Sequence, residues 1–153
     1  MNIEIKKLTN NETDHFLQLL HIFNNVFEWD NFSNPNPLQL KRLLDNKFFI
    51  VFIAIADDVV VGGLTAYILE RYDSEKPSAY IYDIAVTKEM QRNGIGKSLI
   101  EKFIAYCNDQ KFSEVFVQAE SEDTHAINFY KKTPISSELH AVHFTYLLDK
   151  YKL

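Results

Sequence analysis

The apolar positions in the first third of the chain change from a period of two to a period of three or four. Residues 3–8 (IEIKKL) alternate and predict a strand. Residues 13–27 predict a helix capped by Thr13, because one set of apolar side chains recurs at helical spacing: Phe16, Leu19, Leu20, Phe23 and Phe27. A loop with two prolines follows, and residues 38–46 (LQLKRLLDN) predict a second helix with Pro37 suited to its first turn.

The middle of the chain consists of β-type runs separated by turn residues. Residues 48–56 (FFIVFIAIA) are long enough for one buried strand. The Asp57–Asp58 pair predicts a tight turn into a partner strand at residues 59–69, so the two runs read as a hairpin. Residues 79–86 (AYIYDIAV) predict a further strand after a polar loop.

The last third alternates between helical and strand patterns. Residues 96–110 predict an amphipathic helix, residues 113–120 a strand, residues 124–132 a short helix and residues 140–149 (HAVHFTYLLD) a final strand. Strands and helices alternate late but not early. The order therefore predicts a mixed α/β sheet with helices on both faces, in a single domain over residues 1–153.

Composition narrows the class of protein. The chain has 153 residues, 46% of them hydrophobic, and a net charge of −5, which argues against nucleic acid as a partner. The start lacks the apolar stretch of a signal peptide, and the longest apolar run is about half of what a membrane span needs, so we expect a cytoplasmic protein without a membrane partner. Cys107 lies in a helical apolar pattern and is expected to be a buried thiol. The histidines show no metal-ligand spacing, and no metal is expected.

Residues 91–98 (QRNGIGKS) join a predicted strand to a predicted helix and suit an anion, because exposed amides and the helix dipole meet there. Three phosphate-binding patterns compete. A nucleotide-triphosphate loop matches Gly96-Lys97-Ser98 but has Gln91 where its first glycine belongs. A dinucleotide-binding loop has Leu99 in place of its third glycine. Only the pattern Gln-x-x-Gly-x-Gly fits without a mismatch.

The stretch DIAVTKEMQRNGIGKSLI (residues 83–100) resembles the acetyl-coenzyme A motif of the GNAT superfamily of N-acetyltransferases. A second motif follows at the expected distance, in FVQAE and then AINFYKK, whose Asn128 and Tyr130 match the family. The resemblance implies the GNAT fold: a central, mostly antiparallel sheet that splays between its fourth and fifth strands. Within the superfamily, YIYDIAV, FVQAE, SEDT and VHF, with the early IFNNVFEWDNF and LKRLL, are most similar to aminoglycoside 3-N-acetyltransferases of the gentamicin-resistance type.

This resemblance implies an activity and a cofactor. An acetyl group would move from acetyl-CoA to a primary amine of an aminoglycoside by direct transfer in a ternary complex, within a homodimer. The main chain of Ile84 and Val86 would pair with the pantetheine arm, and the Ile84 amide would face the thioester oxygen. The implied cofactor-binding residues are Ile84, Ala85, Val86, Gln91, Arg92, Asn93, Gly94, Ile95, Gly96, Lys97, Ser98, Asn128 and Tyr130.

Amine acetylation also needs a base, because an amine with a pKa of about 10.4 is protonated at neutral pH. Asp83 interrupts an otherwise apolar strand, which is costly unless it faces a cleft or is paired, and Glu120 ends the neighbouring strand. Glu122 and Asp123 suit either an acceptor site or the start of a helix. Tyr130 is the family's candidate acid for the departing sulfur, or alternatively a packed aromatic residue.

The acidic loop around Trp29 offers further candidates for the acceptor site. Glu28 and Asp30 flank this aromatic residue and suit a cationic, ring-shaped substrate, although a solvated loop anchored by Trp29 explains them equally well. Three other functions stay open: acetylation of another small amine, polyamine or protein lysine, a degenerate nucleoside triphosphatase, and a module that binds acyl-CoA without catalysis.

Overall fold

The computed structural model describes residues 2–149, which form two compact units divided after Glu120. The first unit contains, in chain order, β1 (Ile3–Lys7), α1 (Thr13–Phe27), α2 (Pro37–Asp45), β2 (Phe49–Ala56), β3 (Val59–Leu69), β4 (Ser78–Val86), the short 3-10 turn η1 (Lys88–Met90), α3 (Ile95–Asp109) and β5 (Glu114–Val117). The second unit contains α4 (Thr124–Lys131).

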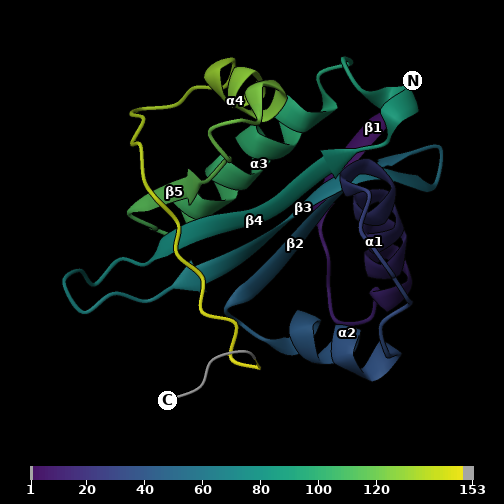
Figure 1. The fold of residues 1–153 in the computed structure, drawn as a ribbon. Coiled ribbons are helices and arrows are strands. Elements are labelled where there is room, and N and C mark those ends of the chain that lie inside the picture. The colour runs from purple at the N-terminus through teal and green to yellow at the C-terminus, as the bar shows by residue number, and fades with distance from the viewer. Residues whose placement is uncertain (1, 150–153) are drawn as a thin grey trace. The chain divides into compact units, whose positions relative to one another are not determined.

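The five strands form one sheet in the order β1-β2-β3-β4-β5, the mixed α/β architecture expected from the sequence (Figure 1). Neighbours are antiparallel except β4 and β5, which are parallel. That parallel pairing runs from Ser78↔Glu114 to Ile81↔Val117 and stops there, although β4 continues to Val86. The expected splay between the fourth and fifth strands is therefore confirmed.

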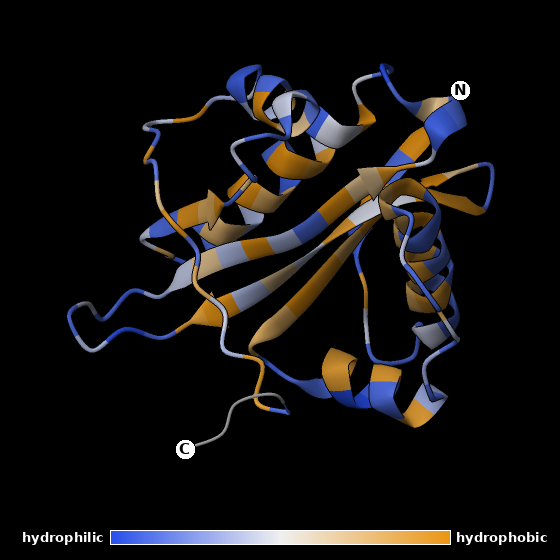
Figure 2. Ribbon diagram, viewed as in Figure 1, coloured by the Kyte–Doolittle hydropathy of each residue, from blue (hydrophilic) through white to orange (hydrophobic). Residues whose placement is uncertain are grey.

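Helices cover both faces of the sheet, and the alternation along β2 shows why. Val51 and Ile53 belong to the core cluster that includes Leu19 of α1. Phe52 points the other way, and its ring meets that of Phe103 in α3 at 5.4 Å. Strand β2 is apolar along nearly its whole length because both of its faces are covered (Figure 2).

Helix α1 approaches the sheet closely at a glycine. A Cβ added to Gly63 would lie 2.5 Å from the Phe52 carbonyl oxygen and 2.8 Å from a methyl carbon of Leu19. No larger residue fits between α1 and β3 at this point, so Gly63 sets the depth at which the helix packs.

The start of α1 differs from the expected cap. Thr13 is the first helical residue, and Glu12 occupies the N-cap position. The Glu12 carboxylate accepts hydrogen bonds from the Thr9 amide and hydroxyl and pairs with Lys6 at 2.6 Å and His15 at 3.2 Å. Burial alone would raise the pKa of Glu12, but these hydrogen bonds outweigh it and lower the pKa to about 2. The carboxylate therefore joins β1 to α1 and explains why a glutamate precedes this helix.

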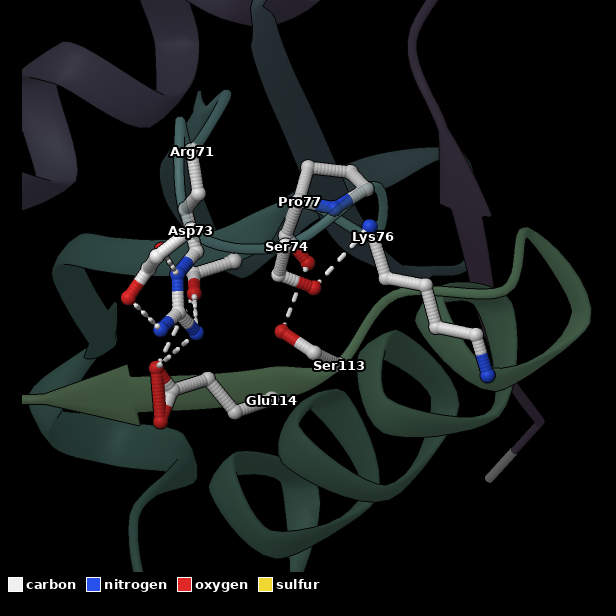
Figure 3. A network of polar contacts seen from close by, with 8 residues as sticks. Arg71, Asp73, Ser74, Lys76, Pro77, Ser113 and Glu114 are labelled. Atoms are coloured by element: carbon white, nitrogen blue, oxygen red, sulfur yellow. Dashed lines mark hydrogen bonds and ion pairs between the residues drawn. The ribbon is translucent and has the colours of Figure 1, made fainter.

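A polar network fastens the start of β5 to β4, at the end opposite the splay (Figure 3). The Ser78 hydroxyl donates to Glu114 at 2.9 Å, and Arg71 holds Asp73 through two hydrogen bonds of 2.9 Å. The same guanidinium lies 3.6 Å from Glu114. The two parallel strands are thus held together where they begin and separate where they end.

The second unit departs from the sequence prediction at its end. Residues 140–149 were expected to form a strand, and the structure contains none there. A strand is defined by pairing, and the apolar alternation of HAVHFTYLLD cannot supply a partner by itself. Several large apolar side chains of this segment are exposed instead: Val142, Phe144 and Leu148.

Candidate functional site

The turn before α3 has the backbone geometry of an anion cradle. Gly94 occupies the N-cap position of α3 with φ +78°, and Arg92 precedes it with φ +64°. A Cβ added to Gly94 would meet nothing within 4 Å, so the glycine faces open space. The first helical hydrogen bond runs from the Ser98 amide to the Gly94 carbonyl, and helical geometry leaves the amides of the first turn without a helical acceptor.

Side chains of the turn brace this geometry. The Asn93 amide group donates to the Met90 carbonyl at 3.1 Å. The Gln91 amide group donates to the Val86 carbonyl at 3.0 Å, which ties the turn to the end of β4. Lys97 lies 3.8 Å from Glu101 on the next helical turn. The glutamine of the Gln-x-x-Gly-x-Gly pattern thus has a structural task of its own.

The second half of β4 exposes peptide groups at the splay. The Thr87 amide donates to the Val61 carbonyl at 2.8 Å, and Val86 and Ala85 pair with residues of β3. Since antiparallel pairing alternates along a strand, the peptide groups of Ile84 and Val86 point away from β3, toward the side where β5 has ended. An extended ligand beside β4 would meet these groups.

An irregularity in β4 changes the direction of its side chains. Thr65 of β3 pairs with Asp83 and Ala66 pairs with Ile81, so Tyr82 is an extra residue in β4. Bulges of this kind re-aim side chains and are common beside active sites. Here Tyr82 and Asp83, although adjacent in sequence, line the same cavity.

This cavity, which we call the β4 groove, has a volume of about 210 Å³. Its wall is mostly apolar and aromatic, with Phe16 and Leu20 from α1 and Phe49, Tyr67 and Tyr82 from the strands. Asp83 is the one ionisable carboxyl group among its lining residues, and its burial raises its pKa to about 6. Burial, followed by the nearby Tyr82 and Asp83, also raises the pKa of Tyr67. The β4 groove therefore combines an apolar wall with a carboxylate that can accept a proton near neutral pH.

A larger cavity of about 390 Å³ adjoins the turn before α3. It is lined by the first strand, at Ile3 to Ile5, and by the turn and helix residues Gly94, Ser98 and Lys102. Its walls combine first-turn helix atoms and the ammonium of Lys102 with the carboxylate of Glu4, so the charges around this cavity are mixed. Lys102 was not among the residues expected from the sequence, because its place near the turn depends on the packing of α3 against β1.

The other predicted carboxylates do not line the β4 groove. Glu120 is exposed beyond the end of β5, whose predicted range of residues 113–120 is too long, since the strand ends at Val117. Glu28 is the left-handed C-cap residue of α1, with φ +54°. Asp30 is exposed. Trp29 packs against Phe23, Phe27 and Phe32 with ring centroids 5.7–6.2 Å apart, so it anchors its loop.

In the second unit, the predicted residues lie on or before α4. Asp123 is the N-cap, and its carboxylate accepts a hydrogen bond from the Ala126 amide at 2.9 Å. Glu122 and Asn128 are exposed, and Tyr130 is half-buried. The ring of Tyr130 lies 5.1 Å from that of Phe129. Asp123 therefore serves the start of the helix.

Sequence reasoning missed the aromatic part of the β4 groove. Tyr67 and Tyr82 read as ordinary strand residues, and nothing in AYIYDIAV shows that a bulge turns Tyr82 toward the same cavity as Asp83. One signal was available: three tyrosines lie at residues 67, 80 and 82 in neighbouring strands. No cluster of three potential metal ligands and no helix able to cross a membrane occurs within residues 2–149.

Comparisons with known proteins agree with this geometry. The model of the acetyltransferase (GNAT) family matches residues 16–133. Two crystal structures of the aminoglycoside acetyltransferase meta-AAC0020 from an uncultured soil metagenomic sample, one with trehalose and one with sisomicin, are 46% and 45% identical over 95% of each chain, with a TM-score of 0.93.

More distant relatives were found among structures and sequences. A second aminoglycoside acetyltransferase from an uncultured soil metagenomic sample is 32% identical over 96% of this chain and all of its own, with a TM-score of 0.86. Human N-acetyltransferase 8 is 26% identical over 126 residues, 74% of this chain, and the match spans only 56% of the human protein. With a family match over most of its length, a glycine turn at the start of α3 and a splayed strand beside it, the chain belongs to the acetyltransferase (GNAT) family.

Proposed function

We propose that this protein transfers the acetyl group of acetyl-CoA to the 3-amino group of an aminoglycoside, directly and in a ternary complex. The similar soil acetyltransferases support the substrate class, since one of them was crystallised with sisomicin. The observation that carries the proposal is the half-buried Asp83 carboxyl group in an aromatic groove beside the splayed strand.

The residues of the turn fit the cofactor that this family uses. Acetyl-CoA, when bound, supplies an acetyl group on a thioester and a pyrophosphate that needs hydrogen-bond donors. The turn offers amides from Arg92 to Ser98, and the open space beside Gly94 leaves room for phosphate oxygens. Gln91 holds the turn against β4, and Asn93 stabilises its backbone. Lys97 adds positive charge nearby.

The exposed edge of β4 would hold the pantetheine arm. The peptide groups of Ile84 and Val86 point into the splay and can pair with amides of the ligand, while Ala85 stays paired with β3. The Ile84 amide would donate to the thioester oxygen, where negative charge develops during transfer. Ile95 is buried and anchors the first turn of α3, and Gly96 keeps that turn free of a side chain.

Asp83 would take the proton of the acceptor amine. Its pKa of about 6 leaves it ionised at neutral pH while keeping it a better proton acceptor than an exposed carboxylate. A cationic amine is also attracted to the only carboxylate of the β4 groove lining. Tyr130 would donate a proton to the departing sulfur, and Asn128 would contact the cofactor. Glu120, Glu122, Asp123, Glu28 and Asp30 would add negative charge around the acceptor.

Free-thiol release measured across an amine panel tests this function. The panel contains gentamicin, sisomicin, spermidine and a lysine peptide, each with acetyl-CoA. We expect release with the two aminoglycosides and a product that nuclear magnetic resonance identifies as 3-N-acetylated. Release with spermidine alone would show that the acceptor is a polyamine rather than an aminoglycoside. Acetylation at another amino group would show that the 3-amino group is not the reacting position. Coenzyme A binding without release on any amine would identify a binding module.

We also propose that the protein acts as a homodimer in the cytoplasm, where acetyl-CoA is made, and protects its host from aminoglycosides. The exposed apolar segment of residues 139–148 supports a dimer, because each chain carries this segment and an edge of β5 that no strand among residues 2–149 pairs with. Both compact units would then act as one functional domain. Expression in a susceptible bacterium should raise the inhibitory concentration of gentamicin.

A further inference from the structure

A row of aromatic rings crosses four strands of the sheet and passes beside Asp83. Neighbouring centroids are 5.0 Å apart for Phe49 and Tyr67, 5.6 Å for Tyr67 and Tyr82, 6.1 Å for Tyr82 and Tyr80, and 4.9 Å for Tyr80 and Phe116. The rings come from four successive strands, β2 to β5. We call Phe49, Tyr67, Tyr82, Tyr80 and Phe116 the aromatic row.

Exposure is greatest in the middle of this row, at Tyr82, and the rings of Tyr67, Tyr80 and Phe116 on either side of it are half-buried. Phe49, at its inner end, is buried in the core, whereas Tyr82 is 56% exposed. A core needs no exposed tyrosine at a bulge, and a large exposed ring is a common feature of binding surfaces. The part of the row around Tyr82 is therefore available to a ligand, while the inner rings fix its position.

The rings of Tyr82 and Tyr80 are held in place by their neighbours. Tyr82 contacts Tyr67 and Tyr80 through edge-type contacts with interplanar angles of 73° and 62°. Tyr80 is stacked on Phe116 at an angle of 5°, and its hydroxyl donates to the Gln118 side chain at 3.1 Å. Rigid tyrosines provide contact area at a low cost in conformational entropy. The row is thus preorganised before any ligand arrives.

The chemistry of the row selects one kind of ligand. Tyrosine rings attract cations over their faces and accept apolar ring faces, and their hydroxyl groups exchange hydrogen bonds with polar substituents. Asp83 supplies one negative charge at the inner part of the row. A ligand that satisfies all of these groups has several rings, apolar ring faces, hydroxyl groups and amines. A linear polyamine would reach Asp83 without covering the row.

We propose that the aromatic row is a ring-stacking subsite that binds the outer rings of a multi-ring amino sugar while its reacting ring lies at Asp83. This inference rests on the proposed function and extends it, because it assigns the preference for multi-ring acceptors to Tyr82 rather than to carboxylates alone. Tyr80 and Phe116 extend the subsite toward β5.

The test compares sisomicin with 2-deoxystreptamine, the single diamine ring that lies within it. Tyr82→Leu removes the ring but keeps an apolar side chain. We expect the preference for sisomicin over 2-deoxystreptamine in kcat/KM to fall about tenfold, chiefly through the KM of sisomicin. Tyr82→Phe keeps the ring and should restore most of the preference. Tyr72→Leu is the matched control, since Tyr72 is fully exposed in the loop before β4.

A binding measurement separates this inference from the proposed function. Sisomicin is titrated into the wild type and Tyr82→Leu in the presence of coenzyme A, and we expect an affinity about tenfold lower for the variant. Turnover of sisomicin with equal affinity and equal preference in both proteins would overturn the subsite and leave the function intact. Tyr82-dependent binding of sisomicin without turnover would keep the subsite and remove the function. No binding of sisomicin to the wild type would remove both.

Discussion

At the scale of single residues, Asp83 combines two conditions that oppose each other. Its carboxyl group is half-buried against aromatic side chains, which disfavours the charged form and raises its pKa to about 6. A general base must nevertheless be charged when it meets the amine. A pKa close to but below neutrality satisfies both conditions, because the group is ionised at pH 7 and still binds a proton well.

We expect Asp83→Asn to lower kcat/KM by about 10²–10⁴-fold, the usual range for a removed general base. In the wild type, kcat/KM should rise with pH through an apparent pKa near 6 as Asp83 loses its proton. The variant should lack this acidic limb. A pH series of initial rates with coenzyme A release as the readout measures both effects, and an acidic limb that persists in the variant would assign it to another group.

The same substitution should stabilise the fold at neutral pH. The pKa of Asp83 is raised on folding, so the folded state binds the proton more tightly and loses stability as pH rises from about 4 to about 6. Partial exposure reduces the full effect, and we expect Asp83→Asn to gain about 1–2 kcal/mol at pH 7. The gain should vanish near pH 3. Thermal unfolding of both proteins between pH 3 and pH 8 measures it, and a gain independent of pH would point to packing instead.

At the scale of elements, two glycines perform different tasks. Gly63 lets α1 approach β3, since a Cβ at this position would lie 2.8 Å from a methyl carbon of Leu19, and it would also lie 2.5 Å from the Phe52 carbonyl oxygen of β2. Gly94 instead adopts φ +78°, a conformation that suits glycine, and it faces open space. We infer that it provides backbone freedom and room for a ligand. One glycine sets packing, and the other shapes the anion cradle.

We expect Gly63→Ala to destabilise the protein by about 2–3 kcal/mol, because the methyl group meets backbone that cannot move away. The melting temperature should fall by roughly 4–12 °C in a chain of this size. Val59→Ala in the same strand is the control, since Val59 is 57% exposed and should change stability by only about 0.5 kcal/mol. Equal effects of the two substitutions would show that α1 can shift away from β3.

Two substitutions at Gly94 separate strain from steric blocking. Alanine at φ +78° is strained by about 1–2 kcal/mol, whereas asparagine tolerates this conformation better. Both residues place a Cβ in the open space of the cradle. We therefore expect both variants to bind coenzyme A at least about tenfold more weakly by calorimetry, while Gly94→Asn melts closer to the wild type. Wild-type affinity in Gly94→Asn would mean that no phosphate approaches this glycine.

Periodicity predicted the elements of the first unit well, since the observed helix α1 and strand β3 match their predicted ranges. The exceptions depend on contacts that a pattern cannot contain. Glu12 rather than Thr13 occupies the N-cap position of α1, and its carboxylate pairs with Lys6 and Thr9 instead of with an amide of the helix. The turn at Gly94 was recognisable because a glycine motif carries its own backbone requirement, whereas the bulge at Tyr82 follows from pairing with β3.

At the scale of the whole molecule, the described sheet does not explain why so many apolar residues near residues 140–149 are exposed. Residues 140–149 have the apolar pattern of a strand without being one, and Leu139, Val142 and Phe144 are 89%, 77% and 80% exposed. Strand β5 pairs only with β4 within residues 2–149, so an edge of the sheet is open as well. The homodimer proposed above would satisfy both features reciprocally, as the second copy of a closed two-fold dimer does.

We expect Val142→Asp with Phe144→Asp to convert the proposed dimer to a monomer, because charged side chains at these positions oppose burial in an interface. The control is Leu38→Asp in α2, which is 74% exposed and lies outside the segment. Light scattering after size-exclusion chromatography measures the mass at several concentrations. A wild type that is monomeric at all of them, or a dimer that survives the double substitution, would contradict pairing through this segment and leave its exposed apolar residues to another partner.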